Sequence, residues 1–226
     1  MKRKQLYFKR HSSGFTLIEI AIVLVIIGLL LGGVLKGQEL INSAKVKNLA
    51  SDFRNVPLYI YSYQDKYRAL PGDDPLASTH VTSATNATGT LLGNGRIDGK
   101  WDVYTSGSTA ESALFWQHVR MAGIAAGITD TTDTAGYPPR NTLGGLMGVT
   151  NSTATDTPIS NLTGTYVVCS GGIIGKFAKQ LDVALDDGDT QKGSMRAIND
   201  PTAPGAAAAG AVLPNDTDLY TVCMGS

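Results

Sequence analysis

The sequence has few of the residues on which catalytic and metal-binding motifs depend. Its 226 residues include only two cysteines and three histidines. Cys169 and Cys223 lie near no histidine or second cysteine at the spacing of a zinc site, and His80 and His118 lie near no nucleophile motif. No phosphate-binding loop is present, and no serine has the G-x-S-x-G frame of a nucleophile elbow. These absences argue against the common enzyme classes, so we expect no enzymatic activity.

Acidic residues are also absent from the first eighteen positions, whereas basic residues gather there. The five basic side chains of this segment are Lys2, Arg3, Lys4, Lys9 and Arg10. From Phe15 to Leu35 the chain is almost wholly apolar, and Glu19 carries its only formal charge. As a helix these 21 residues would span about 31 Å, close to the thickness of a bilayer's hydrocarbon core. The basic cluster predicts a cytoplasmic N-terminus by the positive-inside rule, with the rest of the chain outside the cytoplasm.

Two ordinary interpretations of this segment are a cleaved secretory signal and a simple membrane anchor. A secretory signal has a shorter apolar stretch and a small-residue cleavage site, and the exit through Gly32 and Gly33 does not fit that pattern. A simple anchor fits the length but not Glu19, because a carboxylate in the bilayer costs about 3 kcal/mol on insertion scales. The position of Glu19 therefore predicts a partner for its carboxylate.

Residues 13–20, SGFTLIEI, follow a short basic leader and precede an apolar run. In this they resemble the processing signature of prepilins and pseudopilins. The resemblance implies that a prepilin peptidase and methylase cuts after Gly14 and N-methylates the new terminus at Phe15. It also implies that Glu19 neutralises the terminal amine of a neighbouring subunit, so that a lone charge in lipid becomes a paired one.

The function implied by this resemblance is that of a structural subunit of a type IV pilus or related filament. The expected partners are other pilins in a homo- or hetero-polymer, the inner membrane, and a pilus assembly or secretion platform. Alternatives are a pseudopilin of a type II secretion system, or a minor pilin that acts as an adhesin or DNA receptor. Lys36 stands where many major pilins have a proline, and with a mature length of about 212 residues this favours a minor or specialised pilin.

The net charge of the chain does not indicate nucleic-acid binding. Removal of the leader would leave 14 basic and 19 acidic side chains, a net charge of −5. Such a body would not attract a polyanion through its net charge. The expected location is the bacterial inner membrane, followed by an extracellular pilus or a periplasmic pseudopilus.

The predicted organisation has four parts: a leader at 1–14, a transmembrane helix at 15–35, a continuing amphipathic helix at 36–70, and a globular domain at 71–226. The amphipathic part carries apolar residues at alternating spacings of three and four, and these are Val46, Leu49, Phe53, Val56, Ile60, Tyr63 and Tyr67. Pro57 is expected to bend this helix.

Beyond residue 70 the pattern predicts a helix at 109–123 capped by Ser108 or Thr109, a strand at 165–169, a helix at 176–185 and a strand at 219–223. His118 is interpreted as a hydrogen-bonded core residue. The polar stretches at 76–107 and 129–164 read as loops, the first with at most short strands and no core pattern.

The expected fold is α+β, with the long N-terminal helix packed on a small antiparallel sheet and loop-rich insertions, as the resemblance also implies. The two cysteines predict one disulfide, Cys169–Cys223, and hence an oxidising compartment.

Acidic residues gather in one segment of the C-terminal third, namely Asp182, Asp186, Asp187 and Asp189. Their hard oxygen ligands suit calcium, and we expect Asp186, Asp187 and Asp189 as ligands if a site exists. The alternative is a solvated turn with Gly188 as the helix C-cap and no cofactor. Residues 94–98 also match the second half of a calcium loop, but Thr90 and Leu92 stand at its preceding ligand positions.

Overall fold

The computed structural model describes residues 15–89, 92–153, 155–201 and 203–226. The elements in chain order are α1 (Leu17–Tyr67), α2 (Ala77–His80), α3 (Glu111–Met121), β1 (Met147–Thr150), β2 (Val167–Ile174), α4 (Gly175–Leu185), β3 (Met195–Asn199) and β4 (Leu219–Gly225). The chain divides into two compact units, Met1–Ser43 and Ala44–Ser226.

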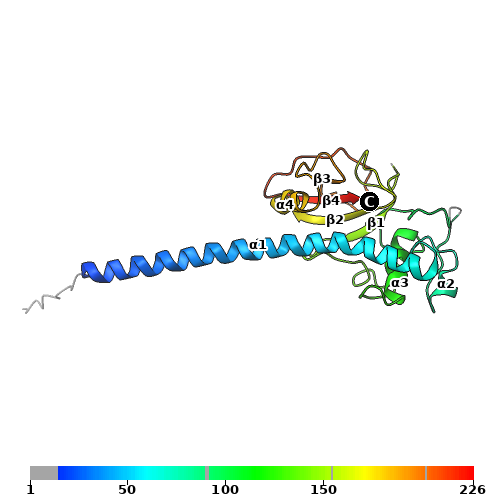
Figure 1. Ribbon diagram of the computed structural model, residues 1–226, viewed down its shortest axis with the longest axis horizontal. Helices are drawn as coiled ribbons and strands as arrows, with labels where there is room; N and C mark the ends of the chain where they lie inside the picture. The colour runs from blue at the N-terminus through cyan, green and yellow to red at the C-terminus, as the bar shows by residue number, and fades with distance from the viewer. Residues whose placement is uncertain (1–14, 90–91, 154, 202) are drawn as a thin grey trace, which may run out of the picture. The chain divides into compact units, whose positions relative to one another are not determined.

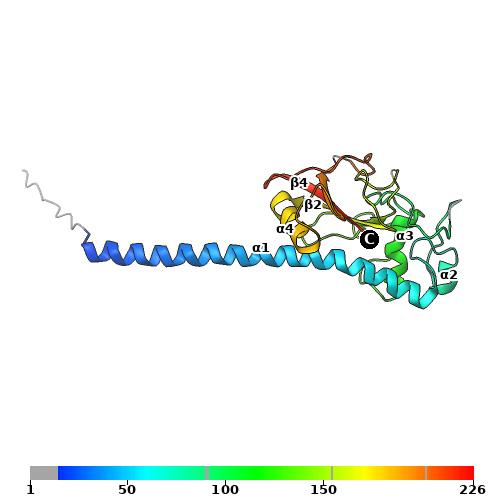
Figure 2. The same cartoon turned by 45° about the horizontal axis from the view of Figure 1, so that its top comes forward.

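Helix α1 is continuous over 51 residues and contributes to both units. Its buried residues all lie in the second unit and form one stripe, namely Val46, Leu49, Ala50, Phe53, Val56, Ile60 and Tyr63. Pro57 lies inside the helix, and the ribbon bends toward its C-terminal end in both views (Figures 1 and 2). The helix ends at Tyr67, three residues before Leu70, because a run of turn-forming residues follows.

In the second unit the four strands form one antiparallel sheet in the order β1-β2-β4-β3. Helix α4 connects β2 to β3, and β4 then inserts between these two strands. Figures 1 and 2 show the C-terminal part of α1 running along one side of the sheet, with α4 at one end of the strands. The α+β class, with an antiparallel sheet beside the long helix, agrees with the prediction.

The sheet is buried on both faces because apolar side chains occupy alternate positions toward each side. On the face toward α1, Val168 and Val222 join the larger core that contains Phe53. On the opposite face, Val167 and the two cysteines pack against loop residues, which are Trp101, Ile159 and Leu162. Loops that the sequence marks as polar therefore close the second face.

The predicted disulfide is present. Cys169 of β2 and Cys223 of β4 are direct partners in the strand register, and both are fully buried. The bond joins residues 54 apart, for which the chain-entropy model gives about 4 kcal/mol of stabilisation. It fixes the pairing of the two central strands.

Several boundaries differ from the sequence predictions. Helix α3 begins at Glu111 with Ala110 as its N-cap and no side-chain capping bond, so the predicted caps Ser108 and Thr109 are wrong. The described residues of the segment 76–107 contain helix α2 and no strand, and they do contribute to the core, through Ala77, Val81, Ala84, Ile97 and Trp101 among others. Strands β1 and β3 were not predicted, and β1 lies within the stretch 129–164 that reads as polar.

Candidate functional sites in the N-terminal helix and the acidic cluster

The N-terminal part of α1 exposes every large apolar side chain between Phe15 and Leu35. The apolar stretch of this helix contains no buried residue. Within the described residues, α1 is the one helix long and apolar enough to cross a membrane. Soluble monomers rarely expose so much contiguous apolar surface, which marks the segment as a membrane or protein contact.

Thr16 and Glu19 form a reciprocal cap at the start of α1. The backbone N–H of Thr16 donates to Oε2 of Glu19 at 2.7 Å, and the Thr16 hydroxyl donates to the same oxygen at 2.8 Å. In return, the Glu19 N–H donates to the Thr16 hydroxyl at 3.3 Å. This is a capping box, in which the N-cap and the third helical residue satisfy each other's N–H groups.

The capping box was not foreseen, although its signal, Thr-x-x-Glu before an apolar run, is present in the sequence. It places the Glu19 carboxylate at the first turn of the helix, close to the chain position of Phe15. Phe15 itself is 84% exposed. Gly14 lies outside the described residues, so cleavage after it and the role of Glu19 in assembly stay predictions.

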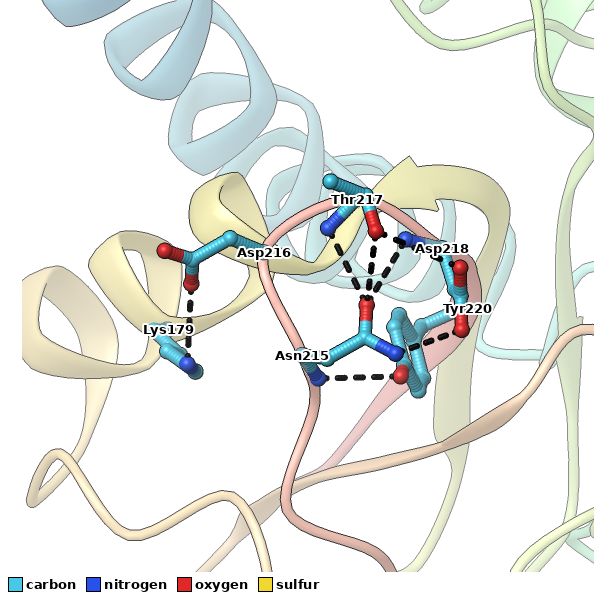
Figure 3. A network of polar contacts seen from close by, with 6 residues as sticks. All are labelled: Lys179, Asn215, Asp216, Thr217, Asp218 and Tyr220. Atoms are coloured by element: carbon cyan, nitrogen blue, oxygen red, sulfur yellow. Dashed lines mark hydrogen bonds and ion pairs between the residues drawn. The ribbon is translucent and has the colours of Figure 1, made fainter.

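Helix α4 positions the acidic segment and is itself held from one side by the loop before β4 (Figure 3). Lys179 pairs with Asp216 at 2.9 Å. The loop is organised by Asn215, whose Oδ1 accepts from the N–H groups of Thr217 and Asp218 at 3.0 and 2.9 Å. This network contacts α4 at Lys179, one turn before Asp182.

Three carboxylates meet at the C-terminal end of α4. One oxygen from each of Asp182, Asp186 and Asp187 lies within 4.8 Å of the others. Asp182 is fully buried and its two carboxylate oxygens have no hydrogen-bond partner among the described residues. Burial, together with the negative charges of Asp186 and Asp187, raises the pKa of Asp182 to about 6, against a lowering contribution from the Gly188 backbone N–H.

Asp189, which the sequence suggested as a ligand, is not part of this group. Its Oδ2 pairs with Lys192 at 2.9 Å, and this ion pair lowers the pKa of Asp189. The C-cap of α4 is Asp186 rather than Gly188, although Gly188 does take a left-handed conformation with φ of +87°. The structure thus groups Asp182 with Asp186 and Asp187.

The loop at 93–98 uses its oxygens internally. Asn94 donates through Nδ2 to Asp98 at 2.9 Å and accepts from the Arg96 N–H at 2.8 Å. The carboxylate of Asp73 accepts from the N–H groups of Gly93 and Gly95, at 2.5 and 2.7 Å. These bonds explain the shape of the loop without an ion.

A buried aspartate and a histidine meet beside a cavity of about 440 Å³. Nδ1 of His80 lies 2.7 Å from Oδ2 of Asp74, and the Tyr63 hydroxyl donates to the same oxygen at 2.8 Å. Such a pair could orient a base, but no serine, threonine or cysteine is among the described residues that line the cavity. The arrangement therefore lacks the nucleophile of a catalytic triad.

His118 is the core residue that the sequence predicted. It is fully buried, its Nδ1 accepts from the Gly72 N–H at 3.0 Å, and its Nε2 lies 2.8 Å from the Thr85 carbonyl oxygen. Burial lowers the pKa of His118, so the ring is neutral and carries its hydrogen on Nε2.

Comparison with known proteins identifies the N-terminal segment. A family model described as the prokaryotic N-terminal methylation motif matches residues 9–35, and this motif is the signature of type IV pilins and pseudopilins. No curated protein and no solved structure matches the chain significantly. The motif supports a pilin-like or pseudopilin protein with a structural rather than an enzymatic role, and together with the apolar helix it fits membrane anchoring.

Proposed function

We propose that this protein is a structural subunit of a type IV pilus or a related filament. In this proposal a prepilin peptidase cuts after Gly14 and methylates Phe15, and the mature chain polymerises through its N-terminal helix. The observation that carries the proposal is the methylation motif at 9–35, in a segment whose large apolar side chains are all exposed from Phe15 to Leu35. Lipid covers such a surface before assembly, and neighbouring helices cover it in a filament.

The charge at the helix start gives this packing a register. Cleavage after Gly14 would create an amine at the N-terminal end of α1, where the helix dipole already places positive charge. A carboxylate there is favourable, and Glu19 is held within the first turn by Thr16. Since an unpaired charge in an apolar medium costs several kcal/mol, subunits are driven to align where amine meets carboxylate.

The remaining features fit an extracytoplasmic body. The five basic residues before the helix favour a cytoplasmic N-terminus. The Cys169–Cys223 disulfide needs an oxidising compartment, which the periplasm and cell surface provide. The body then extends from the inner membrane or from the filament surface.

Lys36 and the chain length favour a minor or specialised subunit over a compact major pilin. The finer alternatives are a pseudopilin of a type II secretion system and a minor pilin that acts as an adhesin or DNA receptor. Filaments labelled on the cell surface would support a pilus, whereas incorporation restricted to the periplasm would support the secretion pseudopilus.

The test replaces Glu19 by alanine and counts subunits in sheared or purified filaments by quantitative immunoblotting. Loss of a pairing worth a few kcal/mol should lower incorporation on the order of tenfold or more. Glu39→Ala is the matched control, because Glu39 is an exposed acid of the same helix, and its one ion pair among the described residues is with Lys36, at 2.7 Å. Mass spectrometry of the wild type should find N-methylated Phe15 as the first residue.

Equal incorporation of the Glu19 and Glu39 variants would overturn the assembly role. An unprocessed chain that still begins at Met1 in mature filaments would overturn the cleavage site.

A further inference from the structure

Two exposed leucines flank the loop before β4, at the end of the body where α4 begins. Leu213 and Leu219 are 67% and 51% exposed. Leu219 is the first residue of β4 and pairs in register with Ile174, the N-cap of α4. The Gly175 N–H donates to the carbonyl oxygen of Asp218 at 3.0 Å. The loop 213–219 therefore lies against the first turn of α4, with a leucine exposed at each of its ends.

Lysines from two helices meet at the same turn of α4. The ammonium group of Lys176 lies 4.9 Å from the centre of the Phe177 ring, and that of Lys45, on α1, lies 5.8 Å from it. The buried ring brings these two cations together close to Ala44, where the second unit begins. Lys47 follows on α1 and is exposed. None of the three lysines forms an ion pair within the described part of the chain, so their charges suit an anionic partner.

The acidic side chains of the adjacent loop are engaged by other residues. Asp216 pairs with Lys179 at 2.9 Å, and the carboxylate of Asp218 accepts from the Asn215 amide and the Thr217 hydroxyl (Figure 3). The unit Ala44–Ser226 as a whole is acidic, with 13 basic and 17 acidic side chains. The three lysines therefore form a basic surface on a body whose net charge is negative.

We propose that a basal surface, made of Lys45, Lys47, Lys176, Leu213 and Leu219, docks on anionic lipid headgroups of the membrane that α1 enters. Lysines beside exposed apolar side chains are typical of protein surfaces at a bilayer interface. The ammonium groups contact lipid phosphates there, and the leucines enter the headgroup boundary. Because the rest of the body is acidic, an anionic membrane repels it and attracts the basal surface, which orients the body.

The length of chain between the membrane segment and Lys45 keeps the basal surface within reach of the bilayer. Lys45 follows Leu35, the last residue of the apolar segment, by ten positions. Ten residues span at most about 35 Å when fully extended, and about 15 Å in a helix. The inference rests on the membrane insertion that the proposed function includes, but not on filament assembly. The contact would hold the body against the membrane before assembly, and incorporation into a filament would break it.

The test places the full chain in lipid nanodiscs of phosphatidylcholine alone or with about one third phosphatidylglycerol. A water-soluble acetylating reagent modifies the lysines, and peptide mass spectrometry gives the rate at each one. We expect Lys45, Lys47 and Lys176 to react at least about threefold more slowly in the anionic nanodiscs than in the neutral ones. Lys66 and Lys192, which lie outside the basal surface, should react at the same rate in both. In about 1 M NaCl, where the Debye length is about 3 Å, the difference should largely disappear.

Leucine variants test the apolar part of the contact. Leu213→Asn combined with Leu219→Asn should reduce the slowing at Lys176 in anionic nanodiscs by about half or more. Both leucines are exposed, so we expect the double variant to fold. Leu58→Asn combined with Leu76→Asn is the matched control, because these leucines are 58% and 56% exposed outside the basal surface. This control should leave the slowing at Lys176 unchanged.

Equal rates at the basal lysines in the two kinds of nanodisc, with the chain retained in both, would overturn the inference and leave the proposed filament role intact. Equal slowing of Lys66 and Lys192 would also overturn it, because the membrane would then act on the whole body. Slowing that requires two chains in one nanodisc would assign the surface to a second copy instead of lipid. A chain that separates from the nanodiscs in size-exclusion chromatography contradicts membrane insertion, and the proposed function fails with it.

Discussion

Glu111 begins α3 with a carboxylate that is only 6% exposed and forms no ion pair within the described part of the chain. Burial, with the help of the carboxylates of Asp73, Asp98 and Asp156, raises the pKa of Glu111 to about 7, against one backbone hydrogen bond from the Asp98 N–H. The folded state therefore prefers the protonated acid, whereas the unfolded chain has an ordinary pKa of 4.5. Its contribution to stability falls as the pH rises from about 4.5 to about 7.

Replacement of Glu111 by glutamine should remove this pH dependence. Glutamine keeps the oxygen that accepts from the Asp98 N–H but carries no charge. We expect Glu111→Gln to raise the free energy of unfolding by about 1–3 kcal/mol at pH 8 and by less than about 0.5 kcal/mol at pH 4.5. Denaturant unfolding at both pH values measures the difference. Asp65→Asn, at a side chain that is 86% exposed, should change neither value appreciably; parallel pH profiles for the wild type and Glu111→Gln would contradict the assignment.

Residue identity alone could predict some of the candidate sites and not others. Glu19 was found from sequence because a charge inside an apolar run is conspicuous, and the same segment also contains the Thr16 capping signal. Asp182 was noticed among the acidic residues, but nothing in the sequence says that it is buried. Its burial and the Asp189–Lys192 pair depend on how α4 packs and how the following loop turns, which local pattern does not encode.

At the scale of elements, the sequence located those helices whose apolar pattern repeats over several turns. The stripe on α1 extends over several turns, and α4 has a clear apolar face, so both were located within a few residues. Strand β1 has four residues and β3 has five, which is too short for an alternating pattern to stand out. Both lie at the edges of the sheet, and only their pairing with β2 and β4 identifies them.

The buried stripe of α1 should carry much of the stability of the second unit. Phe53 is fully buried in the larger core, whereas Leu58 on the same helix is 58% exposed. We expect Phe53→Ala to lower the free energy of unfolding by about 3–5 kcal/mol through lost burial and a cavity, and Leu58→Ala to lower it by less than about 1 kcal/mol. Chemical denaturation followed by tryptophan fluorescence measures both, and similar losses for the two variants would show that the stripe is not the packed face.

At the scale of the whole molecule, apolar surface divides sharply along the chain. Among the described residues, 17 of the 24 large exposed apolar side chains precede Ser43, and every residue of the two hydrophobic cores lies at Val46 or later. The sequence predicted an apolar stripe from Val46 onward on a helix packed against the sheet, and in the structure the body's core does begin with that stripe. The unit that starts at Ala44 contains the helix stripe, the sheet and the disulfide together.

A chain that begins at Ala44 should therefore fold without the membrane segment. We expect it to be soluble and monomeric in the absence of detergent and to unfold cooperatively, with a Tm within a few degrees of the value for the body in the full chain. Size-exclusion chromatography and thermal unfolding measure these properties. A chain that begins at Phe15 should require detergent, because its exposed apolar helix is retained.

A shorter chain, which lacks the whole of α1, tests whether the body can fold around the sheet alone. A chain that begins at Arg68 lacks Leu49, Phe53, Ile60 and Tyr63, which fill the core on one face of the sheet. It would expose that face to water, and we expect it to aggregate or to lose cooperative unfolding. If instead it folds as stably as the chain from Ala44, the body does not need the helix for its stability. If the chain from Ala44 folds stably and the chain from Arg68 does not, the second half of α1 is a core element of the body. Only the first half of α1 is then free to contact the membrane or neighbouring subunits.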